Sequence, residues 1–192
     1  MPLPTASLAT LKARSRVTQS LREFFRTQGY WEVETPLISQ DVCVDLWLDP
    51  VAVPVGGGQV RYLQTSPEFA MKRLLVAGAD AIFQFTKAIR SLERGPRHNP
   101  EFTMLEWYRV GDSHREQMQF TEALVRESLR AAQQTAIPSS VQLPSAPFRQ
   151  LAYDEAFELA VGTRVLNLGG ADLRQLASEL GIRVQAPESL DR

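Results

Sequence analysis

Residues 82–108, IFQFTKAIRSLERGPRHNPEFTMLEWY, are typical of two β-strands joined by a charged loop. In the first strand, alternation places Phe83, Phe85 and Ile89 on one face and polar side chains on the other. This pattern predicts a half-buried strand, with Arg90 at its end on the polar face. The fold is expected to form around this hairpin.

The second strand repeats the alternation. Phe102, Met104, Glu106 and Tyr108 share one parity, so their side chains are expected on one face of the sheet. That face would carry an aromatic ring, a carboxylate and a phenol in a row. A carboxylate beside a phenol is suited to receiving the ammonium group of a substrate.

The loop between the strands gathers basic side chains. Arg94, Arg97 and His98 face a single acid, Glu93, and Gly95-Pro96 turns the chain. Such a loop suits a polyanion, because an arginine fork can hold phosphate oxygens in bidentate geometry. Stacking on an aromatic ring would add about 1 to 3 kcal/mol for a nucleobase. The alternative is a basic hairpin whose loop is merely solvated.

The run Arg97–Tyr108, RHNPEFTMLEWY, resembles motif 2 of the class II aminoacyl-tRNA synthetases, in the lysine branch. Thr65-Ser66-Pro67-Glu68 and Met71–Leu75 are similar to a segment of the same branch that contacts the substrate amine, and residues 29–36, GYWEVETP, resemble motif 1. The resemblance places motif 1 at about residues 10–36 and motif 2 at about 82–108. It implies an α+β catalytic domain, with an antiparallel sheet flanked by helices, and a homodimer formed through motif 1.

The resemblance also implies a role for each candidate site residue. Arg90 would be the catalytic residue and hold the α-phosphate of ATP, His98 the outer phosphates, and Asn99 and Phe102 the adenine. Ser66, Pro67 and Glu68 would bind the substrate near its carboxylate end, while Glu106 and Tyr108 would receive its terminal ammonium. No metal ligand is expected in this chain. ATP and Mg²⁺ are the implied cofactors, with magnesium ligands in a C-terminal part of the family's domain.

Two parts of the family's architecture are not found in this sequence, and they refine the expected function. Few residues precede the first helix, so no N-terminal anticodon-binding domain is expected, and the chain resembles the stand-alone elongation factor P lysine ligases. These activate lysine or (R)-β-lysine with ATP and transfer it to a lysine side chain of elongation factor P. No motif 3 is found, so the chain is expected to be an N-terminal portion, truncated before motif 3, that binds ATP weakly and does not catalyse efficiently.

A departure inside motif 2 leaves other functions open. Arg90-Ser91-Leu92 places leucine where the family has an acid, and Glu93 follows one residue later. A non-catalytic module that dimerises or has a regulatory binding role is therefore one alternative. Charging of lysyl-tRNA is another, although the charge balance makes tRNA an unlikely partner.

Composition narrows the classes of protein to which the chain can belong. The chain has 192 residues, 44% of them hydrophobic, which is enough for one buried core. Its net charge of −1 does not recruit nucleic acid or an anionic membrane. No segment long enough to span a membrane and no secretory signal is found, so a cytoplasmic protein is expected. Cys43 is the only cysteine, which excludes an internal disulfide and a cysteine-based zinc site.

The remaining periodicity predicts mostly short elements. A capping box, Ser113 to Glu116, opens a helix to about Gln134, and three glycines, Gly56 to Gly58, form a hairpin tip. The other expected elements are a helix from Leu8 that stops at Gly29, strands at 31–33, 42–48, 59–63 and 148–153, helices at 65–75, 154–161 and 172–180, and a linker at 136–147.

Overall fold

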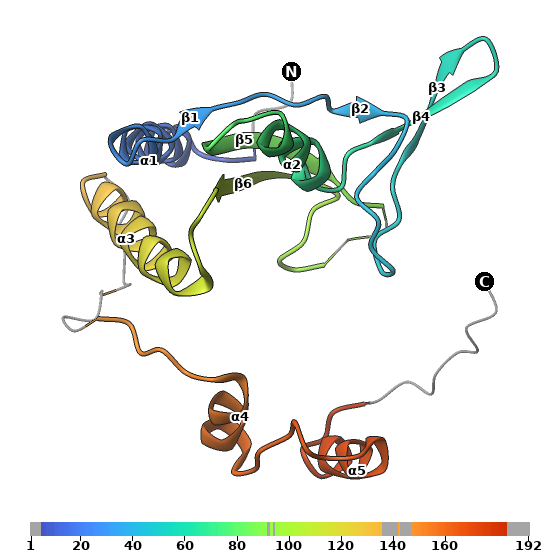
Figure 1. Cartoon of the computed structure of the whole chain (residues 1–192), viewed down its shortest axis with the longest axis vertical. Helices are drawn as coiled ribbons and strands as arrows, with labels where there is room; N and C mark the ends of the chain where they lie inside the picture. Colours follow the sequence, from blue (N-terminus) through green and yellow to red (C-terminus); the bar gives the residue numbers. More distant parts are fainter. Residues whose placement is uncertain (1–4, 92, 94, 136–141, 143–146, 184–192) are drawn as a thin grey trace. The chain divides into compact units, whose positions relative to one another are not determined.

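The computed structural model describes residues 5–91, 93, 95–135, 142 and 147–183 (Figure 1). The chain divides into two compact units, residues 1–143 and 144–192. The first unit holds α1 (Leu8–Thr27), β1 (Trp31–Glu32), β2 (Ile38–Ser39), β3 (Ala52–Gly56), β4 (Gln59–Leu63), α2 (Glu68–Val76), β5 (Ala81–Ile89), β6 (Glu101–Arg109) and α3 (His114–Gln133). The second unit holds α4 (Tyr153–Val161) and α5 (Gly170–Glu179).

The predicted hairpin at residues 82–108 is confirmed as the centre of the first sheet, whose strand order is β1-β5-β6. β5 and β6 pair antiparallel without interruption from Ala81↔Arg109 to Ile89↔Glu101. β1 pairs parallel with β5, so this sheet is mixed, and within it the expectation of an antiparallel sheet holds only for the hairpin. A parallel partner is possible because the long stretch between β1 and β5 can cross over.

One face of this sheet is covered by α1 and α3 (Figure 1). Phe25 of α1 is fully buried and stacks on Phe83 of β5, with ring centroids 4.4 Å apart. Leu105 and Trp107 of β6 and Phe120 of α3 pack against the same cluster. The predicted side-chain parity of both strands is therefore confirmed on this face.

The opposite face packs against α2. Met71 of α2 and Ile82 of β5 are fully buried here, and Val33 and Tyr108 join them. Because helices cover both faces, β5 is not the half-buried strand that alternation predicted. Even Gln84 is only 2% exposed, and its Oε1 accepts a hydrogen bond from the Thr35 hydroxyl at 3.1 Å, which makes that burial tolerable.

The second sheet has the strand order β2-β4-β3 and ends in the predicted glycine tip. The expected strand at 42–48 was wrong: its place is taken by β3, which pairs antiparallel with β4. β4 pairs with β2 and β3 instead, and within 42–48 the Asp45 side chain accepts from the Trp47 amide in a turn. Pro54 is tolerated because β3 is an edge strand.

The predicted helix ends are largely confirmed. Gly29, just after α1, has a φ of 81°, and the capping box of Ser113 and Glu116 forms at the start of α3. α2 begins at Glu68, three residues later than the start of the helix expected at 65–75, and Pro67 is its N-cap. None of the described helices is long and apolar enough to cross a membrane.

The second unit contains the two predicted helices, and Gly162 ends α4 in a left-handed conformation. The expected strand at 148–153 was wrong, because residues 147–152 form no strand and Tyr153 already begins α4. The described part of this unit offers no strand with which it could pair. Most of the expected linker, at 136–141 and 143–146, lies outside the described residues.

Candidate substrate-binding site

The segment before α2 is fixed to the end of β5. Gln64 is buried, and its side-chain amide donates to the Thr86 hydroxyl and to the carbonyl of Lys87, both at 2.8 Å. The Ile89 amide donates to the carbonyl of Gln64 at 3.0 Å. These bonds bring residues 64–68 onto the face of β5 and β6 that carries Glu106.

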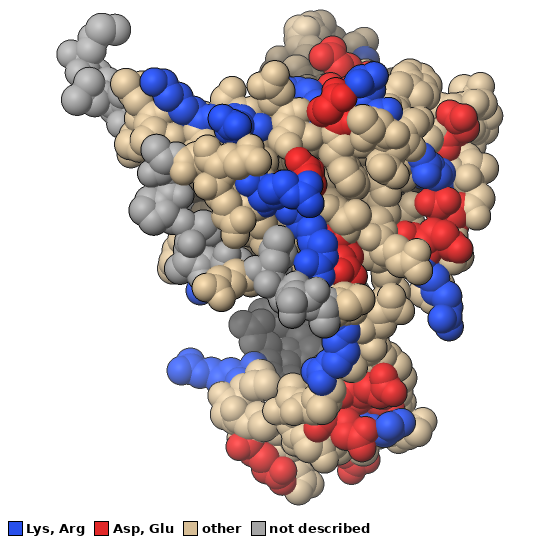
Figure 2. Space-filling model, turned by 90° about the vertical axis from the view of Figure 1, so that its left-hand side faces the viewer, with Lys and Arg blue, Asp and Glu red and all other residues tan. Residues whose placement is uncertain are grey.

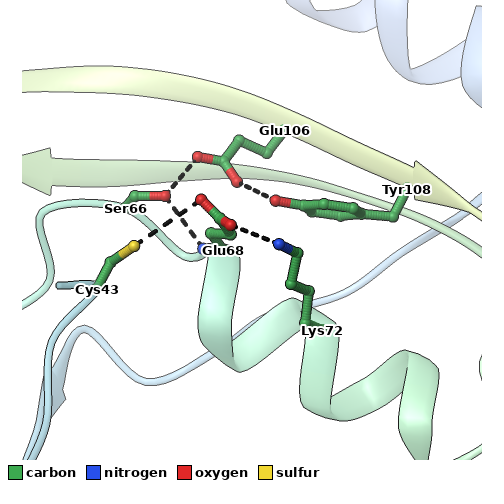
Figure 3. A network of polar contacts seen from close by, with 6 residues as sticks. All are labelled: Cys43, Ser66, Glu68, Lys72, Glu106 and Tyr108. Carbon is green, nitrogen blue, oxygen red and sulfur yellow. Dashed lines mark hydrogen bonds and ion pairs between the residues drawn. The ribbon is translucent and has the colours of Figure 1, made fainter. Parts of the chain in front are cut away.

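Ser66 links this segment to β6. Its hydroxyl donates to Oε1 of Glu106 at 2.6 Å and accepts from the backbone amide of Glu68 at 3.1 Å (Figure 3). The phenol of Tyr108 donates to the other oxygen of Glu106 at 3.0 Å. Both carboxylate oxygens of Glu106 are thus oriented by hydroxyl donors, and each retains a lone pair for a further donor.

Glu68 lies next to this group, in the first turn of α2. Its Oε1 pairs with Nζ of Lys72 at 2.6 Å, and its Oε2 accepts a weak hydrogen bond from the thiol of Cys43 at 3.8 Å (Figure 3). Lys72 lies in a segment whose sequence resembles one that contacts the substrate amine, but sequence reasoning gave it no role of its own and gave none to Cys43. The i,i+4 spacing of Glu68 and Lys72 on a helix was a usable signal, whereas nothing in the sequence placed Cys43 beside Glu68.

The two carboxylates change the acidity of their neighbours. Burial, followed by the charge of Glu106, raises the pKa of Tyr108 far above its ordinary value. Burial and then the charges of Glu68 and Glu106 raise the pKa of the Cys43 thiol. The hydrogen bond to Glu68 raises the pKa of Lys72. The phenol and the thiol therefore stay neutral donors at neutral pH, and Lys72 stays charged.

A small cavity of about 70 Å³ adjoins the cluster and is lined by Asp41, Cys43, Ser66 and Arg73, among others. A larger hollow of about 650 Å³ is lined by residues of α1 and of the end of α3, including Lys12 and Arg16. None of the sequence-predicted site residues lines that larger hollow. The chemistry is concentrated around the small cavity.

Arg90 and Phe102 form a second group on the same face. The guanidinium carbon of Arg90 lies 5.1 Å from the ring centroid of Phe102, and its Nε donates to the Thr65 carbonyl at 3.3 Å. Nη1 of Arg90 is 3.5 Å from Glu93. Glu93 thus pairs with the arginine, while Leu92, at the position of the family's acid, lies outside the described residues.

The remaining predicted residues lie apart from these contacts. His98 and Asn99 are exposed on the loop, where Gly95 and His98 exchange two backbone hydrogen bonds. Pro67 is fully buried, and its carbonyl accepts from the Met71 amide at 2.9 Å, so its visible role is to begin α2. Across the described ranges, no three His, Cys, Asp or Glu side chains gather as metal ligands would.

Comparison with known proteins gives one matching family and a consistent set of relatives. The family described as tRNA synthetases class II (D, K and N) matches residues 4–185. The chain is 44% identical over 183 residues to an elongation factor P–(R)-β-lysine ligase of Pseudoalteromonas translucida, covering 93% of this chain and 52% of the relative. It is 38% identical over 195 residues to the ligase of that name from Vibrio cholerae, covering 99% and 56%. The chain therefore spans about half the length of the curated relatives it matches.

Proposed function

The chain belongs to the class II tRNA synthetases of the D, K and N group, and we propose that it takes part in activating lysine or (R)-β-lysine with ATP. The aminoacyl-adenylate would then react with a lysine side chain of elongation factor P. The names of the relatives support this substrate and this acceptor. The chain spans about half of each relative, so the complete activity is proposed for a protein of the relatives' full length.

The observation that carries the proposal is the pair of carboxylates beside the small cavity. The hydroxyl groups of Ser66 and Tyr108 hold Glu106 through both of its oxygens. A substrate ammonium bound to Glu106 would make a charge-assisted hydrogen bond, stronger than a neutral one. Glu68 offers a second carboxylate for the amine nearer the substrate's carboxyl end. Two carboxylates on one face suit a substrate with two amines.

The nucleotide would lie over the group formed by Arg90 and Phe102. In the first step a carboxylate oxygen of lysine attacks the α-phosphorus, the bond to the leaving pyrophosphate breaks, and the adenylate forms. Arg90 would stabilise the negative charge that develops on the α-phosphate, and Phe102 would stack on the adenine. His98 would meet the outer phosphates and Asn99 the base. In the second step the acceptor amine attacks the activated carbonyl carbon and AMP leaves.

The proposal is tested by ATP–pyrophosphate exchange with L-lysine, with (R)-β-lysine and without an amino acid. Exchange above the third arm is expected in at least one lysine arm, and the faster arm identifies the substrate. Titration calorimetry with ATP and with each lysine runs alongside. A chain that shows neither exchange nor binding of ATP and lysine would contradict the proposal.

A second candidate function follows from the share of the relatives that the chain covers. A half-length chain that binds lysine and ATP without exchange would be a binding module, and catalysis would belong to the longer protein only.

We further propose a homodimer through α1 and β1, which sedimentation of the chain would test. Charging of tRNA is not favoured, because the chain has 21 basic and 22 acidic residues and a net charge of −1. On the face seen in Figure 2, both signs of charge are present.

A further inference from the structure

Lys72 is the only basic side chain among the six residues of the network in Figure 3. Its ammonium lies 2.6 Å from Glu68, whose other oxygen faces Cys43. The charge of Glu106 also contributes to the raised pKa of Lys72, so this ammonium interacts with both carboxylates of the site. The charge of Lys72 therefore contributes to the electrostatic potential of the site, in addition to lying on the surface of α2.

The charges of the network can be counted. Glu68 and Glu106 contribute two negative charges and Lys72 one positive charge, while Tyr108 and Cys43 are held in their neutral forms. The network is left with one net negative charge. Asp41 and Arg73, which line the adjoining cavity, carry opposite charges and do not alter this balance.

We propose that Lys72 is a specificity-determining residue: its ammonium reduces the net charge of the site from two negative units to one, which weakens the attraction for a ligand with two net positive charges more than for a ligand with one. This inference rests on the proposed function, because it takes the network as the site for a substrate's ammonium groups. Lysine carries two ammonium groups and one carboxylate and matches that charge. A ligand of the same shape without the carboxylate charge would lose more affinity to the charge of Lys72 than lysine does.

An i,i+4 pair of Glu and Lys also supports an exposed helix, and that role alone predicts a different result. The side chain of Lys72 is 53% exposed and that of Glu68 37% exposed, so the pair contributes little to folding. Loss of a merely structural pair would lower the melting temperature slightly and leave the order of ligand affinities unchanged. Selectivity between ligands that differ only in charge separates the two roles.

The test compares the binding of L-lysine with that of L-lysinamide at pH 6, where both amines of lysinamide are protonated. The ligands have nearly the same shape and differ by one charge. Calorimetry is performed on the wild-type chain and on Lys72→Met, Lys72→Gln and Lys72→Arg. The matched control is Lys87→Met, because Lys87 pairs with Glu101 at 2.8 Å, is 54% exposed and has the side-chain parity of the opposite sheet face.

The ratio of the two dissociation constants in the wild-type protein is the reference. Both neutral variants should shift the ratio of the two dissociation constants towards lysinamide by about fivefold or more at low salt, and by less at high salt. Lys72→Arg and Lys87→Met should keep the wild-type ratio. Lysine binding with an unchanged ratio in Lys72→Met and Lys72→Gln would overturn this inference alone. Wild-type protein that binds neither ligand would overturn the proposed function and this inference with it.

Discussion

The hydroxyl of Ser66 lies 2.6 Å from the carboxylate of Glu106, although the two residues are 40 positions apart in the chain. One residue precedes α2 and the other lies in the middle of β6. This bond joins the two segments that resemble the synthetase motifs most closely. It also uses the same hydroxyl that accepts the Glu68 amide, so one side chain positions both carboxylates of the candidate site.

Replacement of Ser66 by alanine should weaken lysine binding. The variant loses the donor to Glu106 and the acceptor for the Glu68 amide, and one hydrogen bond to a charged group contributes about 1.5 kcal/mol or more. The dissociation constant for lysine should therefore rise about tenfold, as measured by calorimetry.

The control for this variant is Ser20→Ala. Ser20 of α1 donates to Glu127 of α3, also at 2.6 Å, in the packed interface of these helices. Its loss should lower the free energy of unfolding by about 1 kcal/mol and leave the lysine affinity unchanged. Equal losses of affinity in both variants would show that Ser66 acts through general stability.

Cys43 reports the electrostatics of the site, because no other thiol is present in the chain. Burial makes the largest contribution to its raised pKa, and the charges of Glu68 and Glu106 add to it. Because the thiolate is the reactive form, alkylation by iodoacetamide at pH 8 should be slower than that of a small free thiol. Glu68→Gln removes one of these charges, so the pKa should fall and the reaction should become faster.

The raised pKa of Cys43 also predicts how the free energy of unfolding changes with pH. A thiol whose folded-state pKa is raised favours folding less as pH increases from its ordinary pKa through the raised value. The free energy of unfolding should therefore decrease above about pH 9, and Cys43→Ser should remove part of that decrease.

Glu101→Gln, which affects the pair with Lys87, is the control for alkylation. An alkylation rate as fast as that of a free thiol would contradict the prediction.

The hairpin and its polar face were predictable from sequence because strand parity is a local property. Alternation alone put Glu106 and Tyr108 on one face, and the structure joins them by a hydrogen bond at 3.0 Å. The capping box at Ser113 was equally local. The roles of Arg90, Phe102 and the other site residues came from the resemblance and stay predictions.

The errors share one physical cause, which is that pairing partners are not encoded locally. The stretch 42–48 resembles a strand in its residue types, yet Val44 is 83% exposed and Leu46 75% exposed, and β4 pairs with β2 and β3 instead. The burial of Gln84 depends on Thr35, 49 positions away. The position of Cys43 beside Glu68 also depends on a contact between residues that are far apart in the chain.

Phe25 should be among the most sensitive positions for stability. It is fully buried, stacks on Phe83 and contacts the rings of Tyr30, Trp107 and Phe120. Phe25→Ala should lower the free energy of unfolding in urea by about 3 to 5 kcal/mol, since a large cavity would form between α1 and the sheet. Trp47→Ala removes a larger ring that is 86% exposed and should cost less than about 0.5 kcal/mol. Similar costs for both variants would contradict the assigned core.

Arg90 and Arg22 form a natural pair for testing the nucleotide site. Each guanidinium lies 5.1 Å from an aromatic ring centroid, Arg90 over Phe102 and Arg22 over Phe85, and each is paired with a glutamate. Phe102 and Phe85 have opposite parity across the hairpin, where Phe85 pairs with Leu105, so the two arginines lie over opposite faces of the sheet.

Arg90→Ala should reduce adenylation on the order of a hundredfold, because a positioned donor to the transition-state charge is lost. The ATP dissociation constant should rise about tenfold, as expected for the loss of a charge-assisted bond. Arg22→Ala should leave ATP affinity unchanged and lower the free energy of unfolding by about 1 kcal/mol, since the side chains of Arg22 and Glu32 are 48% and 35% exposed. Pyrophosphate exchange, calorimetry and urea unfolding measure the three quantities. An unchanged ATP affinity in a folded Arg90→Ala variant would remove Arg90 from the nucleotide site, because the geometry it shares with Arg22 would then be only structural.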